Sequence, residues 1–232
     1  MPEVHPTIDA IDRLIARFGP DAVRGVLEPM LTPARLARIE QVLDARLTSV
    51  ATVVEDTYDP HNAAATIRTT EALGLQHLHV IEARFSATKG VTKGSHTWID
   101  LHRWPDPASA IGALHAQGFR VLATLPDAPH SIDDVDVSTP LAIAFGNEHA
   151  GLSAEAIAAC DGAIRVPMYG FSESFNLSVT VGLAMNQIAH RRRLYLGAIG
   201  DLAPEARRHL RARWTALKVR AAVGIVERAL CP

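Results

Sequence analysis

The stretch AIRVPMYGFSESFNLSVTVG, residues 163–182, joins a strand-like run to the start of a long helical pattern. The run AIRVPM is apolar, as buried strands are, and the helical spacing that follows extends from about Ser174 to Leu194. Small and polar side chains crowd the junction, beginning at Gly170. Because a strand that passes into a helix is the unit of α/β folds, the stretch predicts a sheet with this junction at one edge.

Strand-like and helical runs alternate through the middle of the chain. Apolar strands are predicted at residues 49–55, 78–82, 96–104, 119–125, 140–146 and 162–168. Helices are predicted at residues 62–74, 106–118, 153–160 and 174–194. This alternation predicts an α/β fold with a parallel sheet and helices on both faces, and the nearly continuous apolar strands agree with it.

Both ends of the chain are predicted to be helical and to contain no strand. The predicted organisation is an N-terminal helical extension at 1–48, a sheet domain at 49–195 and a basic helical extension at 196–232. Residues 190–232 hold 10 Lys and Arg against 3 Asp and Glu, a balance of +7, whereas the whole chain has a net charge of −2. Such asymmetry is typical of a surface that binds a polyanion, and equally of a solvated helix face.

Composition excludes several classes of protein. No apolar run approaches the roughly 20 residues that span a bilayer, and the first residues lack the pattern of a signal peptide. Cys160 and Cys231 are far apart and form no CxxC motif, so we expect a reducing, cytoplasmic location. The chain has no P-loop, no GxSxG and no Rossmann glycine fingerprint.

Four unusual loops follow predicted strands, at residues 55–68, 123–130, 145–153 and 170–182. Because ligands bind at the carboxyl ends of parallel strands, the four loops predict one site. Individual residues are ambiguous: Asn62 is a common type of helix cap, and Arg68 has no acidic partner nearby in sequence, which leaves both a solvated and a phosphate-binding role open. His77 and His79 lack a third ligand nearby, so we expect no metal site.

Three segments resemble the motifs of the SpoU branch of the SPOUT RNA methyltransferases, in order and in spacing. They are DPHNAAATIRTTEALG (59–74), LAIAFGNEHAGLS (141–153) and IRVPMYGFSESFNLSVTVGLAMNQIAHRRR (164–193). The linking segment KGSHTWIDLHRW (93–104) resembles that of the tRNA guanosine-2′-O-methyltransferases within this branch. The resemblance extends over about residues 33–218.

The resemblance implies a C-terminal trefoil knot, a homodimer, S-adenosylmethionine as methyl donor, no metal, and methylation of guanosine 18 in the tRNA D-loop. It leaves two alternatives open, a ribosomal RNA 2′-O-methyltransferase and a non-catalytic RNA-binding protein. In the family the third motif is the threaded segment and forms much of the cofactor site, where small residues let the backbone approach a ligand. This use explains the crowding of small side chains around Gly170.

Residue roles follow from the same resemblance. Phe175 departs from the Leu usual at its position. Arg68 is expected to clamp a phosphate and the reacting ribose, because its pKa above about 12 makes it a poor base, although the family's proposal of a base stays open. The cofactor-binding residues implied are Thr124, Gly146, Val166 and Phe175. The catalytic residues implied are Arg68, Asn62, Ser174, Asn176 and Glu148. The residues expected to contact RNA are Arg191, Arg192, Arg207, Arg208, Arg211 and Arg213.

Two expectations concern assembly. The long C-terminal helix offers Val179, Leu183 and Ile188 for pairing two copies. The basic helix after Pro204 carries an apolar stripe that includes Trp214, and we expect this stripe to dock on the sheet domain.

Overall fold

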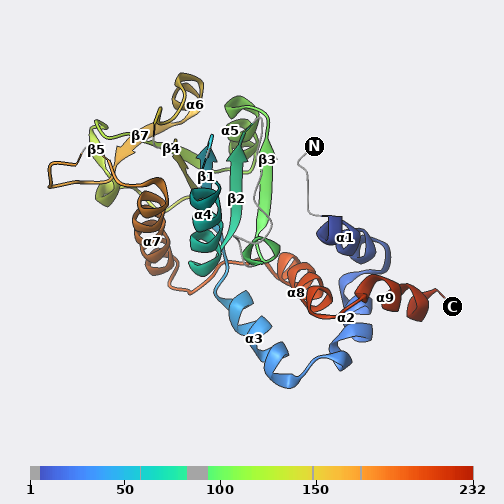
Figure 1. Cartoon of the computed structure of the whole chain (residues 1–232). Helices are drawn as coiled ribbons and strands as arrows, with labels where there is room; N and C mark the ends of the chain where they lie inside the picture. Colours follow the sequence, from blue (N-terminus) through green and yellow to red (C-terminus); the bar gives the residue numbers. More distant parts are fainter. Residues whose placement is uncertain (1–5, 58, 83–93, 148, 173, 232) are drawn as a thin grey trace. The chain divides into compact units, whose positions relative to one another are not determined.

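The computed structural model describes residues 6–57, 59–82, 94–147, 149–172 and 174–231. The chain forms two compact units (Figure 1). Leu47–Ala198 form the sheet unit, and Val4–Arg46 with Ile199–Pro232 form the helical unit. The two helical extensions, at opposite ends of the sequence, thus belong to one folded body.

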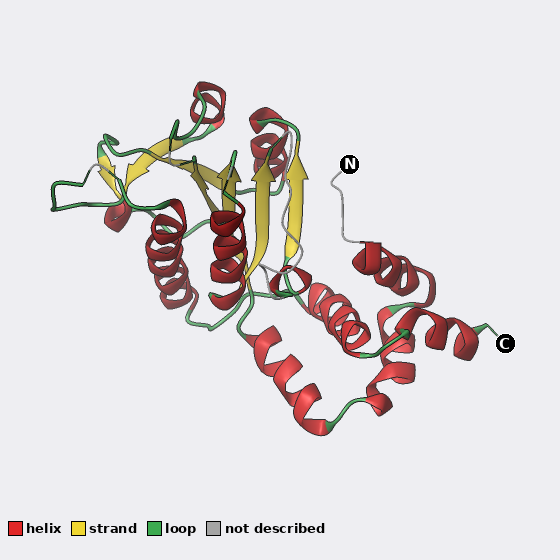
Figure 2. Ribbon diagram, viewed as in Figure 1, coloured by secondary structure: helices red, strands yellow, loops and turns green. Residues whose placement is uncertain are grey.

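The sheet unit is built on parallel strands. Among the described residues the sheet has seven strands in the order β3-β2-β1-β6-β4-β7-β5, and every neighbouring pair is parallel, as predicted (Figure 2). Val53 of β1, for example, lies opposite His79 of β2 and Ala144 of β6. The strands are β1 (Leu47–Glu55), β2 (Leu75–Ile81), β3 (Asp100–Trp104), β4 (Arg120–Thr124), β5 (His130–Ser131), β6 (Leu141–Phe145) and β7 (Gly162–Arg165).

Helices cover both faces of this sheet. Alternate residues of β1 enter two different hydrophobic cores, since successive side chains of a strand point to opposite faces. Val50 and Val54 pack with residues of α4 and α7, whereas Ala51 and Val53 pack with residues of α5 and α6. The helices of this unit are α4 (Pro60–Ala72), α5 (Pro107–Ala116), α6 (Ala154–Ala159) and α7 (Leu177–Leu196).

Some boundaries differ from those predicted. Residues 96–104 are not one strand, because Ser95–Thr97 form a 3-10 turn before β3. The two-residue strand β5 was not predicted, since it is too short to carry a periodic signal and is defined by its pairing with β7. A further 3-10 turn, Ile132–Asp134, follows it.

The helix starts show which side chains cap them. Asp106 and Ser153 cap α5 and α6, since their side chains accept from the backbone N–H groups of Ser109 and Ala156. Asp59 caps α4 by accepting from the backbone N–H of His61 at 2.8 Å, so the interpretation of Asn62 as the cap is wrong. Asn62 lies inside the first turn instead and is buried.

The helical unit has a core of its own. Ala212 and Ala216 of α8 pack with Leu14 of α1 and Val23 of α2, so the described packing of the α8 stripe is with the N-terminal helices. Backbone bonds also join the two segments, since the N–H of Asp201 donates to the carbonyl of Arg46. The elements are α1 (Pro6–Phe18), α2 (Pro20–Leu27), the 3-10 turn Glu28–Met30, α3 (Pro33–Asp44), α8 (Pro204–Lys218) and α9 (Ala222–Leu230).

Trp214 of α8 is buried in this unit, and the guanidinium of Arg46 lies 4.9 Å from its ring centroid. The amphipathic pattern after Pro204 is broken by residues 219–221, where Ala221 has a φ of 58°, and α9 begins as a separate helix. None of the described helices has the length and apolar character that crossing a membrane requires.

Candidate functional site

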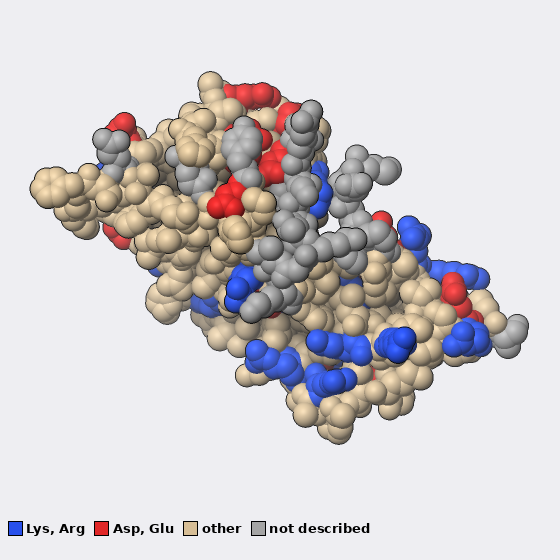
Figure 3. Space-filling view, in the orientation of Figure 1, with Lys and Arg blue, Asp and Glu red and all other residues tan. Residues whose placement is uncertain are grey.

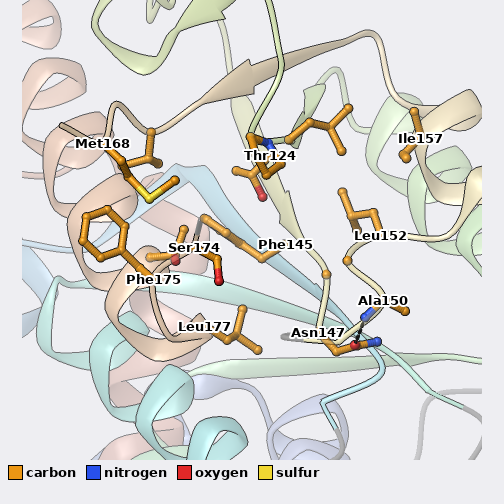
Figure 4. A pocket seen from close by; sticks show the side chains of 16 residues that line it. Thr124, Phe145, Asn147, Ala150, Leu152, Ile157, Met168, Ser174, Phe175 and Leu177 are labelled. Carbon is orange, nitrogen blue, oxygen red and sulfur yellow. Dashed lines mark hydrogen bonds between the residues drawn. The ribbon is translucent and has the colours of Figure 1, made fainter. Parts of the chain in front are cut away.

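A cavity of about 410 Å³ opens at the carboxyl ends of β4, β6 and β7 (Figure 4). This is the edge at which parallel sheets bind ligands. Its volume lies within the range of about 300–1,000 Å³ of small-molecule sites. The walls come from three of the four loops predicted to converge, namely those after β4, β6 and β7.

The wall after β6 is a tight loop that tolerates no side chain at Gly146. A Cβ atom there would lie 1.9 Å from the carbonyl carbon of Gly151 and 2.1 Å from the nitrogen of Leu152. The side chain of Asn147 accepts hydrogen bonds from the backbone N–H groups of His149 and Ala150, at 2.9 and 2.8 Å. The loop therefore folds back on itself and forms one side of the cavity.

Two further contacts anchor this wall. The hydroxyl of Thr124 donates to the carbonyl of Ala144 at 2.8 Å and ties the end of β4 to β6. The Glu55 carboxylate, 5% exposed, accepts from the backbone N–H and the hydroxyl of Ser153 at 2.8 and 2.7 Å. Sequence reasoning missed Glu55, because an acid at the end of an apolar strand gives no sign of a partner 98 residues away.

The third wall comes from the β7–α7 loop and the first turn of α7. Val166, Ser174 and Phe175 line the cavity, and Phe175 is 38% exposed. Asn176 caps α7, since its side-chain oxygen accepts from the backbone N–H of Ser178 at 2.9 Å. Figure 4 shows Phe175 and Ser174 beside Leu177 at this end of the helix.

Asn176 also joins two motifs that are distant in sequence. Its amide nitrogen donates to the side-chain oxygen of Asn62 at 3.2 Å. One amide thus caps α7 and binds α4. The first-motif helix is in this way held against the helix that forms the cavity wall.

Arg68 is not among the residues that line the cavity of its own chain. It is exposed on α4, six residues after Asn62, so the two side chains leave the helix in directions about 120° apart. Within the part of the chain that the structure describes, it forms no ion pair. Glu148, expected to be catalytic, lies outside the described residues.

Two ionisable groups at the carboxyl end of β2 have shifted pKa values, namely the buried His79 and the half-buried Glu82. Burial, reinforced by the charges of His102 and His77, lowers the pKa of His79 to about 3. The ring nitrogen of His79 accepts from the indole of Trp104 at 3.1 Å. Burial likewise raises the pKa of Glu82, although hydrogen bonds from Thr57 oppose the shift. No group of three or more His, Cys, Asp or Glu side chains among the described residues is arranged to hold a metal ion.

Most arginines expected to contact RNA are held by partners within the chain. Arg191 donates to the carbonyls of Ile132 and Val135, while buried Arg192 donates to the carbonyl of Val137 and the hydroxyl of Ser49. These bonds hold the C-terminal half of α7 against β1 and against residues 132–137 within the sheet unit.

In the helical unit, Arg207 pairs with Glu40 and Asp44, Arg211 with Glu28 and Glu40, and Arg213 with Asp12. The acids of the N-terminal helices were visible in the sequence as possible partners. Arg208 is exposed and has no ion pair with another described residue. Figure 3 shows Lys and Arg side chains gathered over the helical unit.

Comparison with known proteins identifies the family. The SpoU rRNA Methylase family matches residues 49–186. A tRNA (guanosine(18)-2′-O)-methyltransferase of Borreliella burgdorferi is 40% identical over 172 residues, which cover 73% of this chain and 79% of the relative.

Solved structures agree with this match. A TrmH/SpoU tRNA modifying enzyme from A. aeolicus has a TM-score of 0.72 and 28% identity, covering 81% of this chain and 98% of that one. An AdoMet-bound rRNA methyltransferase from Sinorhizobium meliloti has a TM-score of 0.55 and 25% identity, covering 65% and 60%. The chain belongs to the SpoU methylase family.

Proposed function

We propose that this protein transfers a methyl group from S-adenosylmethionine to the ribose 2′-hydroxyl of guanosine 18 in tRNA. The observation that carries the proposal is the convergence of Thr124, Gly146, Val166 and Phe175 on one cavity. These are the four residues expected at the cofactor. The names of the relatives supply the substrate, and the family supplies the reaction.

The cavity fits a nucleoside-sized ligand. Its wall combines the exposed backbone of a glycine loop with apolar side chains such as Leu152 and Phe145. Small-molecule sites are largely apolar with few polar groups, as this one is. S-adenosylmethionine, when bound, supplies an electrophilic methyl on sulfur, and we assign its binding to the four residues named above.

The reaction forms an oxygen–methyl bond while the sulfur–methyl bond breaks and the 2′-hydroxyl loses its proton. The guanidinium of Arg68 is suited to hold a substrate phosphate and to stabilise the oxygen as its charge develops. A substrate phosphate or water accepts the proton, since the guanidinium does not lose its own. Ser174, Asn62 and Asn176 position the reacting ribose, and positioning alone lowers the barrier substantially.

We further propose that two copies pair through α7 and that Arg68 acts in the cavity of the partner. Two observations support this arrangement. Arg68 does not line the cavity of its own chain, and α7 exposes Val179 (47%) and Leu183 (48%) beside the third wall. Ile188, expected in the same face, is completely buried within the sheet unit and takes no part.

The trefoil knot remains part of this proposal. The chain leaves β7, near one edge of the sheet, and returns to pack α7 against residues of β1 and β6 in the middle. The loop between β7 and α7 is the segment that would be threaded. A tRNA substrate also supports the predicted cytoplasmic location.

One experiment tests the function directly. The protein is incubated with S-adenosylmethionine labelled in the methyl group, together with separate tRNA and ribosomal RNA pools, and the labelled nucleotide is mapped. We expect label at guanosine 18 of tRNA and none in a tRNA whose residue 18 is a 2′-deoxynucleotide. Label confined to ribosomal RNA would instead establish the second candidate, which the rRNA methyltransferase neighbour favours.

A further inference from the structure

The tip of the β7–α7 loop carries two aromatic side chains that no described residue covers. Tyr169 and Phe171 are 96% and 109% exposed, more than any other large hydrophobic residue in the described part of the chain. A Cβ atom built on Gly170, between them, would meet no atom within 4 Å. Exposed aromatic side chains in a cluster commonly mark a binding surface.

The same loop forms the wall of the cavity. Met168 precedes Tyr169 and lines the cavity, as do Ser174 and Phe175 shortly after Phe171. Since consecutive Cα atoms are about 3.8 Å apart, the two rings begin within one to three residues of the cavity wall. Nucleotides on either side of a ribose that reacts at this cavity must pass close to the loop tip.

The loop tip offers aromatic faces rather than positive charge. Between Val166 and Asn176 the sequence has no Lys or Arg, and Arg165 donates to the carbonyls of Ala128 and Pro129. Phosphate binding is therefore not what the tip provides. Unpaired bases in RNA loops are recognised by stacking on aromatic rings, which tolerates any base because every base has a π face.

We propose that Tyr169 and Phe171 form a stacking platform for the unpaired bases that flank the methylated nucleotide. This inference rests on the proposed function, because it places an RNA at the cavity. Tyr169 and Phe171 are not among the residues assigned above to the cofactor or to catalysis, so the platform would be an additional contact with the substrate. A second copy of the chain is the competing occupant, and the test below separates the two.

The test combines protein variants with modified RNA. Tyr169→Leu and Phe171→Leu keep an apolar side chain but remove the π face, whereas Tyr169→Phe and Phe171→Trp keep it. We expect each Leu variant to lower kcat/KM for the RNA about 5- to 100-fold and each aromatic variant to stay near wild type. Affinity for S-adenosylmethionine and the oligomeric state should not change.

A matched control is Tyr195→Leu, at the far end of α7 from the cavity. Tyr195 is also an exposed aromatic residue, at 60%, and α7 separates it from Leu177 by about 27 Å of helix. This variant should methylate RNA as wild type does. An equal loss in the control would show a general effect of surface rings and overturn the proposal.

The decisive measurement uses RNA in which one flanking nucleotide is abasic. The wild-type protein should lose activity on it, and the Leu variant of the ring that stacks there should lose no more. If the loss from the Leu substitution and the loss from the abasic nucleotide multiply, the ring and the base act independently and the proposal is overturned. Dissociation of the paired copies in the Leu variants would overturn it as well. If the wild-type protein methylates ribosomal RNA instead of tRNA, the proposed function is wrong. The stacking proposal is then tested by comparing wild type and the Leu variants on intact and abasic forms of that ribosomal RNA.

Discussion

The side-chain amide of Asn176 donates to the side-chain oxygen of Asn62 at 3.2 Å, across 114 residues of sequence. Its own oxygen at the same time accepts from the N–H of Ser178 and caps α7. A single residue therefore has two separable tasks, one in helix stability and one in joining the first and third motifs.

The two tasks can be separated by Asn176→Ser. Serine remains a good N-cap, so we expect the free energy of unfolding to change by less than about 1 kcal/mol. It cannot donate to Asn62 as the amide does, so methyl transfer should fall at least about tenfold, a loss that corresponds to one misplaced or unmade hydrogen bond of about 1.4 kcal/mol. Urea unfolding and single-turnover kinetics measure the two effects. Equal activity in both proteins would show that the link to Asn62 has no role in the reaction.

Arg68→Ala should abolish methyl transfer and leave the affinity for S-adenosylmethionine intact, because Arg68 is assigned to the RNA phosphate and the reacting oxygen and not to the cofactor. Arg68→Lys should not rescue activity, since lysine lacks the planar fork that binds phosphate. Near-normal turnover of the Ala variant would remove Arg68 from the mechanism.

The pairing of copies gives a complementation test. Mixed dimers of Arg68→Ala with a cavity-defective chain should recover activity, because one cavity is intact and receives its arginine from the other chain. The defective chain carries Gly146→Ala. Failure to recover activity in verified mixed dimers would contradict action across the interface.

Gly146→Ala should itself prevent cofactor binding. The added methyl would lie 1.9 Å from the backbone of Gly151, so the loop has to open or move. Gly112→Ala is the matched control, because Gly112 lies in α5 with no atom within 4 Å of its Cβ position. Alanine there should be neutral or should stabilise the helix by up to about 1 kcal/mol. Calorimetric titration with S-adenosylmethionine and thermal unfolding distinguish the two variants.

Stability should fall on mild acidification because His79 is buried in its neutral form. Its pKa is lowered from 6.5 to about 3, so between these values the unfolded chain binds a proton that the folded chain does not. Stability is therefore present above pH 6.5 and is lost as the pH falls toward 3, by at most about 1.4 kcal/mol per pH unit. Urea unfolding between pH 7.5 and 4 measures this slope. His79→Phe should flatten it, and an unchanged slope would assign the effect to other groups.

Among the arginines of α8, the exposed Arg208 is expected to contribute to RNA binding and the ion-paired Arg213 to stability. Arg208→Gln should lower the salt dependence of tRNA binding by about 0.7–0.9 in the log–log slope, as one phosphate contact does, and leave stability unchanged. Arg213→Gln removes the bidentate partner of Asp12 and should destabilise the protein by up to about 1 kcal/mol with less effect on the slope. Filter binding at several salt concentrations, with unfolding measured in parallel, tests the division. The opposite pattern would mean that the ion pairs open when RNA binds.

The local sequence pattern was sufficient to predict most strands and helices of the sheet unit. Strands such as 141–145 are continuous apolar runs, and α5 and α6 directly follow Asp106 and Ser153, whose side chains accept from the backbone N–H three residues on. These features depend on neighbours within one turn, which is why the parallel sheet and the loops that form the cavity were predictable. The family resemblance likewise implied Thr124, Gly146, Val166 and Phe175, which line the cavity.

Contacts between residues that are far apart in the sequence could not be predicted and are seen only in the tertiary structure. Asn62 meets Asn176, Arg192 reaches Ser49 across 143 residues, and Arg213 reaches Asp12 across 201. A lone asparagine or arginine has no periodicity that would show whether it faces solvent, a ligand or another chain segment. Opposite charges also attract over a few ångströms in space regardless of their separation in sequence. For this reason the sequence showed the excess of positive charge at residues 190–232, whereas only the fold showed that most of the arginines expected to contact RNA have partners within the chain.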